Sequence, residues 1–181
     1  MNAARKNTNN VLRLNAFIDG EKLVIPHTKS LSIGADFTLE AWVKLKDLSD
    51  YRGIISKRSD TNVNYSFFVT ITGSDDGKLG SFDGSSEVIS NATINDNNWH
   101  HVAQVHSGTT TTFYIDGSAS GGGTQSNFAE NTHPVEIGSA RTDSNDLWDG
   151  LIDEIRIYNR ALSASEISTN YKAGKGSHKN S

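Results

Sequence analysis

Five Asp-Gly dipeptides constrain the fold of this chain more than any other feature of its sequence. They lie at residues 19–20, 76–77, 83–84, 116–117 and 149–150. Asp-Gly favours the two-residue type I′ hairpin turn, because both central residues of that turn need a positive φ. Short runs of β-branched and aromatic residues lie between the turns and are typical of strands. The sequence therefore predicts antiparallel strands joined by tight turns.

The clearest predicted strands are residues 37–45, 64–71, 99–106, 109–116 and 134–140. Weaker candidates are residues 11–18, 22–26, 53–57, 78–82 and 86–90. About a dozen short strands with a single helix candidate predict an all-β fold in which two sheets pack as a sandwich.

One segment near the C-terminus predicts the helix. Ser163 is followed three residues later by Glu166, which is the spacing of a capping box. Leu162 and Ile167 have the spacing of a hydrophobic staple, and Gly174 is a candidate stop signal. We expect one short C-terminal helix that covers an end of the sandwich.

The bulk properties of the chain exclude several classes of function. Its 181 residues are enough for one domain with its own core, and its net charge is −4. Because no basic stripe and no long apolar run occurs, we expect no nucleic-acid partner and no membrane insertion. The absence of cysteine excludes disulfides, a thiolate nucleophile and a cysteine-based zinc site. We expect one domain over residues 10–173, with flexible ends at 1–9 and 174–181.

A predicted strand near the C-terminus, GLIDEIRIY at 150–158, contains two adjacent carboxylates. Strict alternation places Asp153 on one face with Ile155, and Glu154 on the other face with Arg156. The first of these faces is the more apolar, so we expect Asp153 to point toward the core. A core-facing ionised Asp is costly unless it is paired, hydrogen-bonded or bound to a metal.

Five segments of the chain, taken in order, resemble a known family. They are FTLEAWVK (37–44), GIISK (53–57), NNWHHVA (97–103), FYIDG (113–117) and GLIDEIRIYNRALSASEI (150–167). Together they resemble the laminin-G-like domains of the concanavalin A-like lectin/glucanase superfamily, over residues 12–172. The resemblance implies a two-sheet antiparallel jelly-roll sandwich. Such folds host sugar-binding, adhesion and glycan-cleaving domains alike.

The sequence lacks the spacing of carboxylates that a glycan-cleaving enzyme of this fold would need. The resemblance implies that a retaining glucanase would carry Glu-x-Asp-x-(x)-Glu on one strand, which places carboxylates on one face about 5 Å apart. That pattern is absent from the chain. His100 and His106 would lie about 20 Å apart on one strand face, so we expect structural roles for them and for His101. We therefore expect no catalytic residue and no enzyme activity.

A carbohydrate site needs aromatic rings that stack on sugars and polar groups that recognise hydroxyls. We expect this site at a rim formed by loops 47–53, 73–76 and 141–148. The candidate ligand-binding residues are Tyr51, Arg52, Arg141, Asp146 and Trp148.

The remaining aromatic residues have either a packing role or a candidate role in sugar contacts. Trp42 and Trp99 lie in framework motifs of the family, where the resemblance implies packing. Trp148 has a packing alternative as well, because the family often has an aromatic residue just before the last strand. Tyr65, Phe82 and Phe128 are further candidates for sugar contacts.

The resemblance also implies a structural Ca²⁺, because many related sugar-binding jelly rolls hold one. Ca²⁺ takes six to eight oxygen ligands, which suits Asp side chains and loop carbonyls. The candidate metal ligands are Asp19, Gly20 and Asp153. Hydrogen bonds from backbone N–H groups of the N-terminal turn are the alternative partners for Asp153.

These observations favour a non-catalytic, lectin-like module whose partner is an oligosaccharide or polysaccharide. We expect it to be tethered to other domains of a larger bacterial protein, which is secreted or located at the cell surface. An adhesion or protein–protein interaction module of the same fold is the alternative, and a glycan-cleaving enzyme is the third hypothesis.

Overall fold

The computed structural model describes residues 5–7, 11–14, 21–141 and 146–179. Its strands are β1 (Arg5–Asn7), β2 (Val11–Leu14), β3 (Leu23–Ile25), β4 (Phe37–Leu45), β5 (Arg52–Arg58), β6 (Val63–Val69), β7 (Lys78–Phe82), β8 (Glu87–Thr93), β9 (Trp99–Ser107), β10 (Thr110–Ile115), β11 (Ser118–Thr124), β12 (Val135–Ile137) and β13 (Gly150–Tyr158). The helices are the 3₁₀ turns η1 (Lys29–Leu31) and η2 (Gly73–Asp75), and the α-helix α1 (Ala164–Gly174).

The all-β class and the short C-terminal α-helix are confirmed, and every predicted strand overlaps an observed one. The sequence pattern does not predict β1 or the glycine-rich β11. Glycine weakens a strand intrinsically, so β11 is identified only by its pairing with β10, across the turn at Asp116 and Gly117. These two residues have φ values of 50° and 78°, as the predicted type I′ turn requires.

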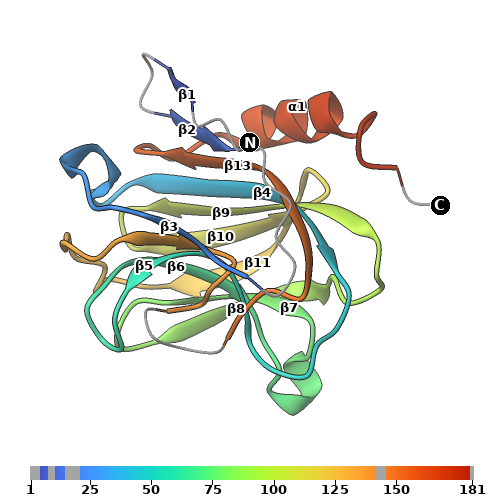
Figure 1. Ribbon diagram of the computed structural model, residues 1–181, viewed down its shortest axis with the longest axis horizontal. Coiled ribbons are helices and arrows are strands. Elements are labelled where there is room, and N and C mark those ends of the chain that lie inside the picture. The colour runs from blue at the N-terminus through green and yellow to red at the C-terminus, as the bar shows by residue number, and fades with distance from the viewer. Residues whose placement is uncertain (1–4, 8–10, 15–20, 142–145, 180–181) are drawn as a thin grey trace.

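The strands form one hydrogen-bonded series rather than two separate sheets. Their order is β1-β2-β13-β4-β9-β10-β11-β8-β7-β6-β5-β12-β3. The link between the two halves of this series is β8, which pairs with β7 on one side and bridges to β11 on the other through Ser90 and Gly121. Figure 1 shows how this single sheet curls, so that the half with β13, β4 and β9 lies over the half with β5 and β6.

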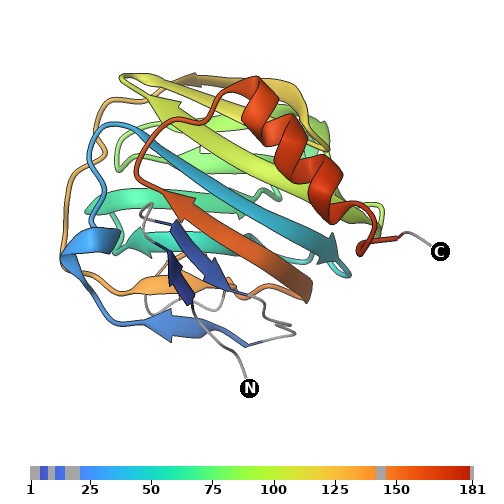
Figure 2. The same cartoon turned by 90° about the horizontal axis from the view of Figure 1, so that it is seen from above.

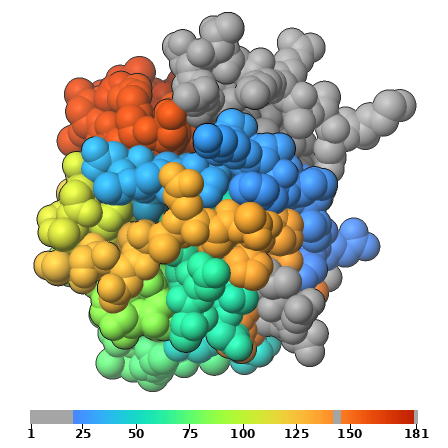
Figure 3. All heavy atoms as spheres, turned by 90° about the vertical axis from the view of Figure 1, so that its left-hand side faces the viewer, coloured from blue at the N-terminus to red at the C-terminus, as the bar shows by residue number. Residues whose placement is uncertain are grey.

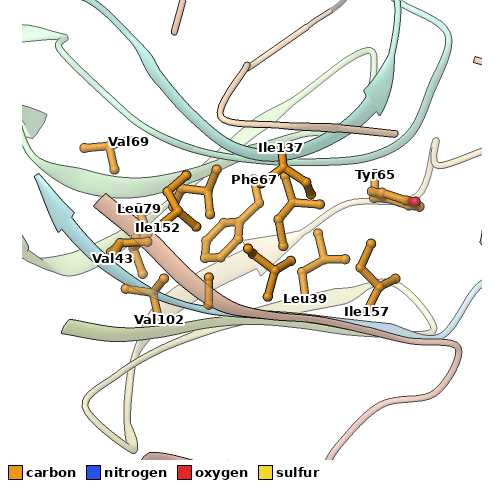
Figure 4. Close-up of a cluster of buried hydrophobic side chains, with 14 of the residues drawn as sticks. Leu39, Val43, Tyr65, Phe67, Val69, Leu79, Val102, Ile137, Ile152 and Ile157 are labelled. Carbon is orange, nitrogen blue, oxygen red and sulfur yellow. The ribbon is translucent and has the colours of Figure 1, made fainter. Parts of the chain in front are cut away.

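The hydrophobic core fills the space between the two halves. Leu39 and Val43 on β4 and Ile152 on β13 point toward Phe67 on β6 and Ile137 on β12 (Figure 4). All five side chains are completely buried. The alternation predicted for residues 37–45 accounts for β4, whose odd-numbered residues face this core.

The predicted orientation of Asp153 is wrong, because β13 contains a bulge. Asp153 pairs with Trp42 and Arg156 pairs with Glu40, so two residues of β13 oppose one residue of β4 between them. Glu154, in the bulge, has a φ of 48°. The extra residue inverts the alternation. Asp153 therefore lies on the outer face with Trp42, whereas Ile152 and Ile155 occupy the core.

Helix α1 covers the outer face of the half of the sheet that contains β13, β4 and β9, as Figure 2 shows from above. Ser163 caps the helix, and the predicted capping box with Glu166 is present. Leu162 and Ile167 pack together with Tyr158 in a second, smaller apolar cluster beneath the helix. No helix in the described part of the chain is long and apolar enough to cross a membrane.

The connection from β11 to β12 closes one side of the curled sheet. Figure 3 shows it in orange, crossing between the blue segment after β3 and the teal loop between β5 and β6. Asn131 in this connection donates to the carbonyls of Lys57 and Asn62, and its own carbonyl accepts from Ser32. These bonds join three distant segments of the chain.

Candidate functional site

A pocket of about 490 Å³ lies beside the β5–β8 half of the sheet. It is lined by Asp50, Tyr51, Arg58, Phe68, Phe82, Glu87, Ala140, Arg141 and Asp146. Phe67 points into the core, so its neighbour Phe68 faces outward and reaches the pocket. The volume is in the range of small-molecule sites in proteins, about 300–1,000 Å³.

Two glycines allow the walls of the pocket to approach each other. A Cβ on Gly53 would lie 1.9 Å from the backbone nitrogen of Ala140, so only glycine lets the segment with Ser139 and Ala140 pack on β5. The segment is held there by hydrogen bonds from the backbone N–H groups of Gly53 and Ala140 to the carbonyl of Asp146. A Cβ on Gly80 would lie 2.5 Å from the Phe68 ring, so Gly80 makes room for this ring.

Aromatic rings form the apolar part of the pocket. The half-buried ring of Tyr51 meets Phe68 edge-on, with ring centroids 5.7 Å apart. The guanidinium of Arg58 lies over the Phe82 ring, 4.9 Å from its centroid. Such a combination of exposed ring surface and nearby charged groups is typical of sites that bind amphipathic ligands.

Three carboxylates make the electrostatic environment of Tyr51 negative. Burial, followed by the charges of Glu87, Asp146 and Asp50, raises the pKa of the Tyr51 phenol. Burial also raises the pKa of Glu87, with a further contribution from Asp75, although Arg58 opposes the shift. The phenol therefore stays protonated at neutral pH and can donate a hydrogen bond.

The structure brings together three of the five residues predicted to bind ligand, namely Tyr51, Arg141 and Asp146. Trp148 is 0% exposed and belongs to the core, so its packing alternative is correct and its ring is not accessible to a ligand. Arg52 is 8% exposed and donates to Asp47, Ser49 and the carbonyl of Leu147, which gives it a structural role at this rim.

Six of the nine lining residues lie outside the predicted ligand set: Asp50, Arg58, Phe68, Phe82, Glu87 and Ala140. Phe82 was a candidate aromatic residue, whereas Arg58, Phe68 and Glu87 had no predicted role. Phe68 could have been found from the predicted strand 64–71, because alternation puts it opposite the core-facing Phe67. Arg58 and Glu87 lie at strand ends, and only the pairing of β5 to β8 brings them to one place. The loop 73–76 does not line the pocket.

Tyr65 and Phe128, the remaining aromatic candidates, pack inside the protein. Tyr65 is completely buried in the core. Phe128 packs edge-on against Phe37 and His106. The Tyr65 ring is therefore not accessible, and the half-buried Phe128 ring packs against the core and does not line this pocket.

A second pocket, of about 580 Å³, is lined by Lys29, Ser30, Ser32, Ile33, Gly34, Ala35, Asp36 and Asn159. No aromatic residue is among these lining residues, so it offers no ring on which a sugar could stack. We therefore take the Tyr51 pocket, defined by the nine residues above, as the candidate site.

Of the three predicted calcium ligands, only Asp153 lies within the described residues. Asp19 and Gly20 lie outside them. The Asp153 carboxylate accepts a hydrogen bond from the backbone of Glu154 at 2.7 Å, and its other oxygen lies 3.1 Å from Nε2 of His178. Both oxygens of Asp153 thus have a partner within the protein, so a calcium ion at this position would compete with His178. Across residues 21–141 and 146–179, no group of three or more His, Asp and Glu side chains could hold a metal.

His178 also corrects the expectation that residues 174–181 form a flexible end. Its ring is 6% exposed and stacks on Trp42, with centroids 4.4 Å apart and planes inclined by 5°. It meets Trp99 edge-on and forms a hydrogen bond with the carbonyl of Gly174. Among the described residues after α1, His178 therefore packs on the outer face of the sheet, whereas its neighbours from Lys175 to Ser177 are exposed.

Comparison with solved structures shows the same fold in proteins of low sequence identity. Domain 4 of an extracellular arabinanase from Geobacillus stearothermophilus, in complex with arabinotriose, superimposes with a TM-score of 0.66 at 22% identity, covering 93% of this chain and 80% of that one. A proposed carbohydrate-binding protein from Bacteroides ovatus superimposes with a TM-score of 0.69 at 15% identity, covering 85% of this chain and 45% of that one.

Comparison of sequences gives a relative and a family. The adhesion G-protein coupled receptor V1 of Danio rerio is 28% identical in an alignment over 153 residues that covers 74% of this chain and 2% of the receptor. Residues 19–168 match the family model Laminin_G_3, described as the concanavalin A-like lectin/glucanases superfamily. The chain therefore belongs to the laminin-G-like domains of the concanavalin A-like lectin/glucanases superfamily.

Proposed function

We propose that this domain is a non-catalytic carbohydrate-binding module and that the Tyr51 pocket holds the sugar. One observation carries the proposal: the accessible ring of Tyr51 lies in a pocket that is also lined by Phe68, Phe82 and several charged groups. A sugar ring has apolar faces and a rim of hydroxyls, so it requires both kinds of surface at once.

The comparisons support the same proposal. The arabinanase domain with the same fold is in complex with arabinotriose, and the Bacteroides ovatus protein carries a proposed carbohydrate-binding function. The fold by itself does not imply this function, so the proposal depends on the pocket.

A screen for glycan binding tests the proposal. The domain is applied to an array of plant, microbial and animal glycans, and each hit is measured by isothermal titration calorimetry. We expect Tyr51→Ala to weaken binding about tenfold, which corresponds to about 1.4 kcal/mol. Tyr51→Phe keeps the ring, so its loss should be smaller and should report only the hydroxyl.

The control variant is Lys29→Ala, which changes the second pocket. It should bind as the wild type does. If Lys29→Ala loses binding while Tyr51→Ala keeps it, the sugar site is in the second pocket. If no glycan on the array binds, the proposed function is wrong.

The non-catalytic part of the proposal rests on the absence of the Glu-x-Asp-x-(x)-Glu pattern from the sequence. Incubation of the domain with each glycan that it binds should release no new reducing ends. Release of reducing ends that a pocket variant abolishes would show instead that the domain is an enzyme.

We further propose that the domain is part of a larger bacterial protein, secreted or located at the cell surface. The similarity to a small part of an adhesion receptor and the fold shared with a domain of an extracellular arabinanase support this context. The receptor similarity also favours the second candidate function, an adhesion module that binds a protein. Glycan binding that depends on Tyr51 would argue for the first function, and a protein ligand that tolerates Tyr51→Ala would argue for the second.

A further inference from the structure

Among the described residues that line the Tyr51 pocket, carboxylates outnumber guanidinium groups. Asp50, Glu87 and Asp146 face Arg58 and Arg141. A ligand with a negative charge would need free guanidinium donors, because bidentate Arg contacts are the usual means of binding carboxylate and sulfate-like groups.

Arg58 has its donors engaged within the protein. Its Nε donates to the carbonyl of Ser59, and its Nη2 donates to the carbonyl of Asp60. Its Nη1 lies 3.4 Å from the hydroxyl of Ser66, and one face of the group rests on the Phe82 ring. The side chain is 8% exposed, so it is part of the pocket wall rather than a mobile cation.

Arg141 is engaged as well. Its Nε lies 3.4 Å from Asp146, and its Nη1 lies 3.5 Å from Asp60. These two carboxylates already offset its charge. An anionic ligand would have to compete with both of them for the same guanidinium.

Glu87 differs from the two arginines because its carboxylate is available. Within the described residues it forms no hydrogen bond or ion pair. A carboxylate accepts hydrogen bonds from sugar hydroxyls, but it repels another carboxylate or a sulfate. Its charge acts on the Tyr51 phenol, as do those of Asp146 and Asp50, so a sugar stacked on this ring would lie in their field.

We propose that the Tyr51 pocket is selective for uncharged saccharides, and that Glu87 is the residue that rejects glycans carrying carboxylate or sulfate groups. This inference rests on the proposed carbohydrate-binding function and adds the chemical class of the ligand. Glu87 accepts hydroxyl donors of a neutral sugar in the same position from which it repels an anion.

The test uses pairs of glycans that differ mainly in charge. The probes are oligogalacturonate and its methyl ester, sialyllactose and lactose, and neutral hexasaccharides of arabinan, xylan, mannan and β-glucan. Binding of each to the intact chain is measured by titration calorimetry at low and at high salt. We expect neutral probes to bind in a Tyr51-dependent manner, and the charged member of each pair to bind at least tenfold more weakly than its neutral partner.

Two variants separate the role of Glu87 from a general effect of charge. Glu87→Gln keeps a hydrogen-bond acceptor and removes the charge, so the tenfold difference should shrink at least threefold. Glu130→Gln removes the same charge from an exposed residue outside the pocket lining and should leave the difference unchanged. High salt should reduce the difference in the wild type, because it screens exposed charges.

The outcomes separate a failure of the charge selectivity from a failure of the carbohydrate-binding function. If anionic glycans bind at the Tyr51-dependent site as tightly as neutral ones, the selectivity is refuted and the carbohydrate-binding function stands. If Glu87→Gln and Glu130→Gln change the difference equally, Glu87 is not the determinant. If no probe binds in a Tyr51-dependent manner, the proposed function fails and this inference fails with it.

Discussion

His101 should make the stability of this domain fall between about pH 7 and about pH 4.5. The residue lies on β9 beneath α1 and is 0% exposed. Its ring meets Trp42 at 5.5 Å and Tyr171 at 6.2 Å between centroids. Neither ring nitrogen has a hydrogen-bond partner among the described residues. The ring is thus held in an environment that disfavours a charge.

Charged groups around His101 do not compensate for its burial. Burial lowers the pKa of His101 to about 4, and the positive charge of Arg156 adds to the shift, whereas Asp116 opposes it. Glu40 lies 3.8 Å from Nε2, beyond hydrogen-bond distance, and it already accepts two hydrogen bonds from Asn170. The imidazole is therefore neutral in the folded protein at neutral pH.

The sign of the effect follows from proton linkage. The pKa of His101 is 6.5 without the protein environment and about 4 in the folded state. As the pH falls below 6.5, the unfolded chain binds a proton that the folded chain does not, so the free energy of unfolding decreases. A difference of about 2.5 pKa units at 1.36 kcal/mol each gives a maximal loss of about 3 kcal/mol, most of which is present at about pH 4.5.

Chemical denaturation of the wild type and of His101→Phe over this pH range measures the effect. Phe keeps a ring against Trp42 and cannot titrate, so the variant should lose about 2 to 3 kcal/mol less than the wild type. His100 and His106 titrate in both proteins, so their contributions cancel in the difference.

Two results would refute this reasoning. Equal pH dependence in the wild type and His101→Phe would mean that His101 keeps an ordinary pKa in the folded state. A steeper loss of stability in the variant would mean that folding raises the pKa of His101, because Glu40 stabilises the protonated ring. The pKa shift would then have the opposite sign.

Three further predictions concern the outer face of the sheet. Gly174→Ala should lower the melting temperature and cost about 1–3 kcal/mol, because its Cβ would lie 2.2 Å from Nε1 of the buried Trp42. Gly176→Ala has no atom within 4 Å of the new Cβ and serves as the matched control, with little change expected. Ser163→Ala should cost about 1 kcal/mol in denaturation, because it removes the cap of α1. Because Asp153 is already paired, Ca²⁺ and EDTA should leave the melting temperature unchanged, and a rise with Ca²⁺ that EDTA reverses would restore Asp153 as a metal ligand.

The site could be predicted from the sequence only in part. Tyr51, Arg141 and Asp146 were found because they lie in polar loops next to predicted strands, where binding residues concentrate. Trp148 was predicted as a ligand contact with packing as the alternative, and its insertion into the core confirms the alternative. Glu87 was missed, because a strand-end carboxylate usually has no role beyond solubility.

Local chemistry by itself determined the turn at Asp116 and Gly117, most of the strands and the helix, whereas Asp76, Asp83 and Asp149 of the other described Asp-Gly pairs do not have the positive φ of a type I′ turn. A type I′ turn depends on the φ values of two residues, and a capping box depends on hydrogen bonds within one helical turn, so Asp116, Gly117, Ser163 and Glu166 were readable from the chain alone. Only the tertiary structure decided which way Asp153 points, because the bulge at Glu154 arises from the pairing of β13 with β4. It also decided the pocket, since strand pairing aligns the lining residues of β5 to β8 and packing brings Ala140, Arg141 and Asp146 to them from a distant part of the chain.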